Sequence, residues 1–207
     1  KLAFEAFQHT ADYDSAISNW ISKERNLQSS KYIKSYPLIK TLRYGENPHQ
    51  KAFWYGLTNV GWNSAEQLQG KELSYNNLLD LESALSTVLE FGYEEKDILM
   101  PNKYASVILK HNNPCGASIG KSSSQAFLNA LECDSVSAFG GIVAFNSNVD
   151  TETAINLKDI FLECVVAPSF DKEALEILKI KKNLRILKLA KDQLPKKNQT
   201  STKSIMG

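Results

Sequence analysis

Lys110 and His111 are two adjacent residues whose side chains suit acid–base chemistry. An imidazole titrates near neutral pH and can take a proton from a reacting group, while an ammonium can stabilise an oxyanion or assist a leaving group. The preceding residues 104–110 are mostly β-branched or apolar, which predicts a short buried strand. The pair is therefore expected at the carboxyl end of a strand, the edge where open parallel sheets bind ligands.

The segment after the pair predicts a turn and then a helix. Pro114 and Gly116 are expected to end the strand, and the serines at 122–124 offer an N-cap for a helix over 123–133.

Two other interpretations of this segment stay open. Lys110 can be a rim residue beside a structural histidine whose ring bonds to loop backbone. Cys115 can be a nucleophile beside His111, although no orienting group for it is evident.

A second group of functional side chains lies in residues 42–50. Arg43 can bind a phosphate with its planar fork, and Tyr44 can stack on or hydrogen-bond to a heterocycle. His49 lies in the same segment, and Gly45 and Pro48 restrict its backbone. An ordinary polar turn is the alternative interpretation.

Two further loops carry polar side chains or glycines. Residues 70–77 include Asn76 and Asn77 just before a helix, where backbone amides can receive an anion, but an N-cap and turn is the more common reason for such residues. Residues 134–141 end in two glycines, which let backbone approach a ligand or adopt positive φ.

Strand and helix patterns alternate along the chain, which predicts an α/β fold with a mostly parallel sheet covered by helices. Residues 1–24 have helical apolar spacing, and the polar stretch that follows reads as a linker over 25–41. The expected elements after the linker are helices over 74–91, 123–133, 150–163 and 174–178, and strands over 104–110, 141–145, 164–167 and 184–187.

Composition restricts the class of protein. The 207 residues carry 24 basic and 23 acidic side chains, so no broad positive surface for nucleic acid or anionic membrane is expected. No apolar run is long enough to cross a bilayer. Three widely spaced cysteines form neither a disulfide framework nor a metal knuckle, which favours the cytoplasm and no metal. The usual dinucleotide and P-loop motifs are absent.

Five ordered motifs together closely resemble the AICAR transformylase/IMP cyclohydrolase family: LRYGENPHQ, GKELSYNN, KHNNPCG, SVSAFGG and VVAPSFDKEALEILKIKKNLRIL. The resemblance implies a zinc-free, cytidine-deaminase-like transformylase fold. It also implies that residues 1–24 are the last helices of a cyclohydrolase domain, and that 42–207 are an incomplete first subdomain of the transformylase.

The activity implied by this resemblance is formyl transfer from 10-formyltetrahydrofolate to the 5-amino group of aminoimidazole carboxamide ribonucleotide, within a homodimer. It implies that Lys110 and His111 are the catalytic pair. The candidate substrate-binding residues are Arg43, Tyr44, His49, Asn76, Asn77, Phe139, Gly140 and Glu163. We expect this stretch alone to be inactive, because the family's site also needs groups from the second half. A non-catalytic nucleotide-binding or assembly module of the same fold is the alternative.

Overall fold

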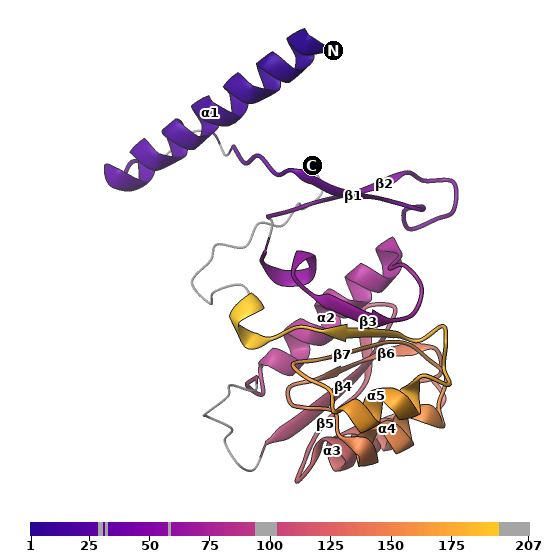
Figure 1. Ribbon diagram of the computed structural model, residues 1–207. Helices are drawn as coiled ribbons and strands as arrows, with labels where there is room; N and C mark the ends of the chain where they lie inside the picture. Colours follow the sequence, from indigo (N-terminus) through magenta and orange to yellow (C-terminus); the bar gives the residue numbers. More distant parts are fainter. Residues whose placement is uncertain (29–30, 32, 58, 94–102, 195–207) are drawn as a thin grey trace.

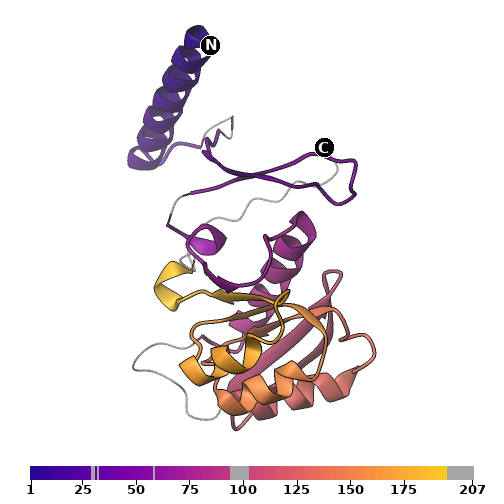
Figure 2. The ribbon, with the colours of Figure 1, turned by 45° about the vertical axis from the view of Figure 1, so that its right-hand side comes forward.

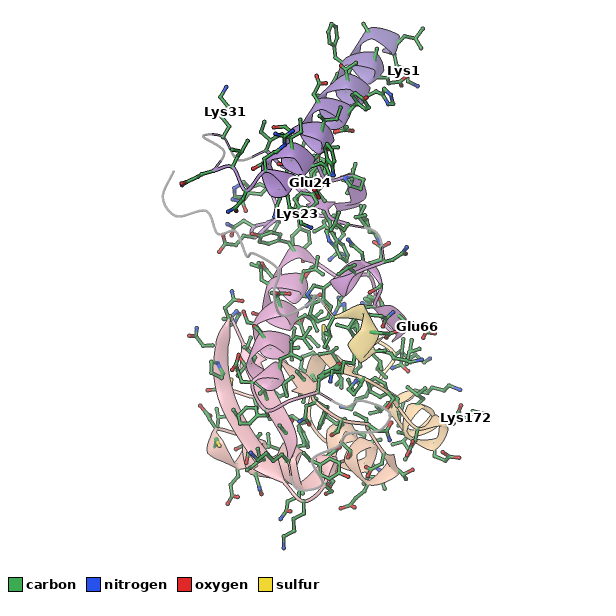
Figure 3. The ribbon with its side chains drawn as sticks, turned by 90° about the vertical axis from the view of Figure 1, so that its left-hand side faces the viewer. Lys1, Lys23, Glu24, Lys31, Glu66 and Lys172 are labelled. Carbon is green, nitrogen blue, oxygen red and sulfur yellow. The ribbon has the colours of Figure 1, made fainter. Side chains whose placement is uncertain are left out.

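The computed structural model describes residues 1–28, 31, 33–57, 59–93 and 103–194. Helix α1, Leu2–Glu24, begins the chain, and none of its residues is buried. It lies apart from the sheet (Figures 1 and 2), and Figure 3 shows Lys1 at the end of the helix that is farther from the sheet. The helical expectation for residues 1–24 is therefore confirmed as one continuous helix, while its assignment to a cyclohydrolase domain stays a prediction.

A small antiparallel hairpin follows, formed by β1, Leu38–Leu42, and β2, Ala52–Tyr55. It lies between α1 and the larger sheet in Figures 1 and 2. The linker predicted over 25–41 is therefore too long by its last residues, which belong to β1. A strand of this length has little sequence signal of its own, because its stability comes from the strand that pairs with it.

A six-stranded sheet forms the centre of the described structure, in the order β3-β8-β7-β6-β4-β5. Its strands are β3 Glu66–Gln69, β4 Tyr104–Lys110, β5 Asn113–Gly120, β6 Gly141–Phe145, β7 Leu162–Ala167 and β8 Arg185–Lys188. The strands β6, β7 and β8 are parallel, and the other pairs are antiparallel. The α/β class is confirmed, but the sheet is mixed rather than mostly parallel.

The connections explain this mixture. Helices α4, Thr151–Lys158, and α5, Lys172–Leu178, link the parallel strands, and a helical crossover returns the chain in the same direction. Strands β4 and β5 are joined by only two residues, which forces an antiparallel pair. The helix expected over 150–163 ends at Lys158, because residues from Leu162 onward belong to β7.

Helices cover both faces of the sheet. Helix α2, Tyr75–Leu89, packs on one face, while α3, Ser123–Cys133, α4 and α5 pack on the other (Figure 1). Alternate residues of β4, β6 and β7 enter the two cores, with Val107 facing α2 and Ile108 facing the three helices. Two short 3-10 helices, Gly61–Asn63 and Lys191–Gln193, complete the described elements. No described helix has the length and hydropathy needed to cross a membrane.

Pro114 and Gly116 do not end a strand as expected, because both lie within β5. Strand β5 is at the edge of the sheet, and its register with β4 shifts where Leu109 faces Pro114 and Ile108 faces Gly116. Proline has no N–H to donate and is tolerated at edge strands and bulges. Gly116 is required for packing, since a Cβ there would lie 1.9 Å from the Ala130 carbonyl oxygen.

Candidate active site

His111 and Asn112 form the two-residue connection between β4 and β5. Their φ angles are +53° and +59°, and Lys110 faces Asn113 across the pair. Positive φ at both central residues defines a type I′ turn, which fits the twist of a hairpin. We call residues 110–113 the Lys–His turn. His111 is exposed and Lys110 is half-buried, so both side chains are accessible at the surface.

Helix α2 holds this turn through two side chains. The Asn112 N–H donates to Asp80 Oδ1 at 2.7 Å, and Ser83 Oγ donates to Asn112 Oδ1 at 3.1 Å. Within the turn, Asn113 Nδ2 donates to the His111 carbonyl oxygen at 2.9 Å. Neither Asp80 nor Ser83 was expected at the site. Their only sequence signal is a helical spacing that places them on the same side of α2 as Asn76.

Lys110 is directed to the loop before β6. Its Nζ donates to the Phe139 carbonyl oxygen at 2.7 Å. Gly140 has a φ of +76°, and its N–H donates to the Phe161 carbonyl oxygen at 2.8 Å. The rings of Phe139 and Phe161 lie 5.1 Å apart and are 60% and 50% exposed, so an apolar surface adjoins the Lys110 ammonium.

The same loop begins with an Asp134 turn. The Ser137 N–H donates to Asp134 Oδ1 at 2.9 Å. Hydrogen bonds from the Ser137 side chain and backbone lower the pKa of Asp134 below its usual value. The carboxylate therefore remains ionised and keeps the start of the loop in place.

Glu163 lies near the start of β7, where Asn77 and Arg185 approach it. Asn77 Nδ2 donates to Glu163 Oε2 at 2.7 Å, and Arg185 Nη1 lies 3.9 Å from the same oxygen. Asn77 is only 4% exposed, and its Oδ1 accepts from the Ser74 N–H in a capping box of α2. The structure thus gives Asn77 two protein partners, and its predicted contact with substrate stays a prediction. Arg185 was missed because an arginine at a strand start has no distinctive pattern.

Arg43 and Tyr44 lie in the loop that connects β1 and β2. The Arg43 guanidinium is 5.1 Å from the Tyr44 ring centroid, and its Nη2 donates to Tyr44 Oη at 3.4 Å. Arg43 and His49 are both exposed, and no described contact joins His49 to the Lys–His turn. Asn76 Nδ2 donates to the Glu46 carbonyl oxygen at 3.3 Å, which links this loop to α2.

A salt bridge also connects the hairpin with the loop between β3 and α2. Lys40 Nζ lies 2.8 Å from Glu72 Oε1, and this hydrogen-bonded ammonium lowers the pKa of Glu72, with a smaller contribution from Arg43. The Glu72 carbonyl oxygen accepts from Arg185 Nε at 3.0 Å. The residues around Glu72 therefore connect the Arg43 loop with the arginine beside Glu163.

Helix α2 brings the predicted site residues to one region. It contacts the Arg43 loop through Asn76, Glu163 through Asn77 and the Lys–His turn through Asp80. The expected position at the carboxyl edge of parallel strands is wrong, however. Because β4 is antiparallel to β6, its carboxyl end lies beside the amino ends of the parallel strands.

Two of the three cysteines, Cys115 and Cys164, are poorly suited to nucleophilic chemistry. Burial raises the pKa of the Cys115 thiol, the Asp134 charge raises it further, and the Lys110 ammonium partly offsets both. Burial raises the pKa of Cys164 far more. A thiolate is the reactive form, so the structure disfavours the interpretation of Cys115 as a nucleophile. The described residues contain no group of three His, Cys, Asp or Glu side chains able to hold a metal ion.

Comparison with solved structures gives a weak similarity. Two forms of Acinetobacter baumannii RibD match with TM-scores of 0.38 and sequence identities of 17% and 19%. They cover 52% and 53% of this chain and 33% and 35% of theirs. At this level the similarity supports no inference about function or fold.

Sequence comparisons are far stronger. Residues 1–207 match the family described as AICARFT/IMPCHase bienzyme. Proteins named bifunctional purine biosynthesis protein PurH from Prochlorococcus marinus subsp. pastoris and from P. marinus strain MIT 9211 are 89% and 56% identical over the whole chain. The chain spans 40% of the length of each of these relatives. With a match over its full length and the ordered motifs in place, this chain belongs to the AICARFT/IMPCHase bienzyme family.

Proposed function

We propose that this chain carries part of the site that transfers a formyl group from 10-formyltetrahydrofolate to the 5-amino group of aminoimidazole carboxamide ribonucleotide, in the biosynthesis of the purine nucleotide IMP. The observation that carries the proposal is the Lys–His turn, which presents an ammonium and an imidazole together on a turn held by α2. Family membership supports the choice of reaction.

The reaction needs a base because the amine of the ribonucleotide is a weak nucleophile. Its lone pair is delocalised into the heterocycle and the carboxamide, so the proton must leave as the formyl carbonyl is attacked. His111 is the residue that takes this proton. Its exposed position on the Lys–His turn leaves the ring accessible to a substrate.

Lys110 supplies positive charge beside this base. As the amine adds to the formyl group, an oxyanion forms on the former carbonyl oxygen, and N10 of the folate must then leave. An ammonium can stabilise the oxyanion or favour protonation of N10, and either role is compatible with its bond to the Phe139 carbonyl oxygen.

The surrounding residues fit the rest of the ribonucleotide. The exposed Arg43 guanidinium provides a fork for the phosphate, with Tyr44 beside it, and Asn76 contacts the same loop at Glu46. The Glu163 carboxylate can accept hydrogen bonds from ribose hydroxyls, and the Phe139 ring with the Gly140 backbone can contact the heterocycle. The role of His49 stays a prediction.

The proposal includes a larger assembly. We propose that a homodimer and the remaining part of a longer protein supply the folate pocket and further catalytic groups, and that IMP cyclohydrolase activity resides in a domain ending at α1. Three free cysteines among the described residues favour a reducing compartment, the cytoplasm.

The deciding experiment replaces His111 in the full-length protein. His111→Ala should lower the rate of formyl transfer by roughly 10² to 10⁴, the usual contribution of a general base. His9→Ala, on α1, is the matched control and should leave formyl transfer unchanged. IMP cyclohydrolase activity, measured on the same samples, should survive His111→Ala and so show that the variant is folded.

The same experiment tests the alternative of a non-catalytic nucleotide-binding or assembly module. That alternative predicts near-normal formyl transfer in His111→Ala with unchanged binding of the ribonucleotide. Such a result would remove His111 from the mechanism.

A further inference from the structure

We propose that Asp80 is a positioning residue for His111, acting through the backbone of Asn112. The catalytic consequence of this proposal rests on the proposed function, while the structural part does not. Asp80 lies on α2, and its described hydrogen bond is with the Asn112 N–H rather than with the imidazole, so its effect passes through the turn.

The backbone of the turn is unusual. Four described residues other than glycine have positive φ, and three of them are asparagines. His111 is the exception. Positive φ is uncommon at residues other than glycine, and a type I′ turn usually carries residues such as Asn-Gly. Such a conformation persists when the surrounding structure holds it, and it is found at functional sites.

Helix α2 contacts the turn at Asn112. Both bonds from α2 end on Asn112, one on its N–H and one on its side-chain oxygen. No hydrogen bond to the His111 ring occurs among the described residues. The imidazole is therefore left available for substrate. The bonds to Asn112 hold the backbone of the turn that carries it.

The acceptor of the Asn112 N–H is a carboxylate oxygen. An ionised carboxylate is a stronger acceptor for a backbone N–H than a neutral group, and the bond is short at 2.7 Å. Asp80 is half-buried, and α2 is anchored by Leu81, Ala84 and Leu85, which are buried on the sheet. The turn is thus attached to a rigid element.

The test compares three variants of the full-length protein. Asp80→Ala should lower kcat for formyl transfer by roughly 10- to 100-fold while KM for the ribonucleotide changes less than about threefold, because the base is misdirected and the binding groups are intact. Asp80→Asn keeps an oxygen acceptor and should stay within about threefold of the wild-type kcat. Glu82→Ala is the matched control, because that carboxylate bonds to Trp62 Nε1 instead.

A double variant separates positioning from a general structural role. Glycine adopts positive φ without strain, so with Asn112→Gly the turn keeps its conformation with less support from the Asp80 hydrogen bond. Asn112→Gly in the Asp80→Ala background should recover part of the lost kcat. Equal kcat in Asp80→Ala and wild type would overturn the proposal. The proposal would also be overturned if Asp80→Asn lowered kcat as much as Asp80→Ala does and the double variant recovered none of the lost kcat.

Hydrogen exchange gives a readout independent of activity. In Asp80→Ala the amide of Asn112 should exchange faster, and in Glu82→Ala it should not. Unchanged exchange in Asp80→Ala would overturn the structural part of the proposal. If His111→Ala retains formyl transfer, the proposed function fails, and the exchange data still decide whether Asp80 holds the turn.

Discussion

The pKa of the Cys115 thiol depends on the charges beside the Lys–His turn. Burial and Asp134 raise its pKa, and Lys110 lowers it. Since the thiolate is the reactive form, a raised pKa moves alkylation to higher pH. We predict that Lys110→Met shifts the pH profile of Cys115 alkylation upward and that Asp134→Asn shifts it downward, as measured by mass spectrometry of labelled peptides.

The other thiols and a distant lysine provide the controls. Cys133 is exposed and should react faster than Cys115, while the buried Cys164 should react slowest. Lys121→Met removes a lysine beyond the far end of β5 and should leave the Cys115 profile unchanged. A downward shift in Lys110→Met would contradict the arrangement of charges described above.

Arg43 gives a second prediction at this scale, which depends on the proposed function. Arg43→Lys should weaken binding of the ribonucleotide by about 5- to 30-fold, because an ammonium cannot replace the two parallel bonds of a guanidinium fork. Isothermal calorimetry on the full-length protein measures this change. Arg25→Lys, at the end of α1, is the control. Unchanged affinity in Arg43→Lys would remove Arg43 from the phosphate site.

Single residues also show how far the sequence alone could predict the site. Lys110, His111 and Arg43 could be selected because ammonium, imidazole and guanidinium groups have few structural uses in loops. Asp80 could not, because it binds a backbone N–H more than thirty residues away, and such a bond leaves no pattern in the sequence. Asn77 was selected, but its burial could not be foreseen from its type.

At the scale of elements, the start of α2 is stabilised by Asn77 more than by its neighbour. Asn77→Ala should lower the free energy of unfolding by about 1–2 kcal/mol, because a buried amide loses bonds to Glu163 and to the Ser74 N–H. Asn76→Ala should change it by less than about 0.5 kcal/mol, since that side chain is exposed and makes one 3.3 Å bond. Urea unfolding of the full-length variants measures both, and equal effects would contradict this account.

The elements predicted well are those whose pattern is local. Strand 104–110 and helix 123–133 have the predicted bounds, because an apolar run and an N-capping serine are sufficient signals. Strands β1, β2, β3 and β5 were not predicted. The first three are four or five residues long, and all four pair at a sheet edge or within a two-stranded sheet, so the strands that pair with them determine them. The edge position of β5 is also what reversed the expectation for Pro114.

At the scale of the whole molecule, α1 exposes a large apolar surface. Leu2, Phe7 and Trp20 are 82%, 77% and 63% exposed, and proteins rarely leave such a surface uncovered. We predict that the isolated 207-residue chain self-associates, as measured by sedimentation velocity. Phe7→Glu combined with Trp20→Lys should shift it toward the monomer. Ile180→Glu, at an exposed residue after α5, should not, and a monomeric wild-type chain would contradict the prediction.

Strands β3 and β8 are neighbours in the sheet although Glu66 and Lys188, which form an ion pair between them, are 122 residues apart in the chain. At a synthesis rate of about 5–20 residues per second, β3 leaves the ribosome roughly 6 to 24 seconds before its partner. Once β7 has been made, its outer edge also waits for β8, and an open strand edge is a site for incorrect pairing. A nascent chain that stalls before Arg185 therefore presents two unpaired strands to chaperones and proteases, and β8 completes the sheet by entering between them.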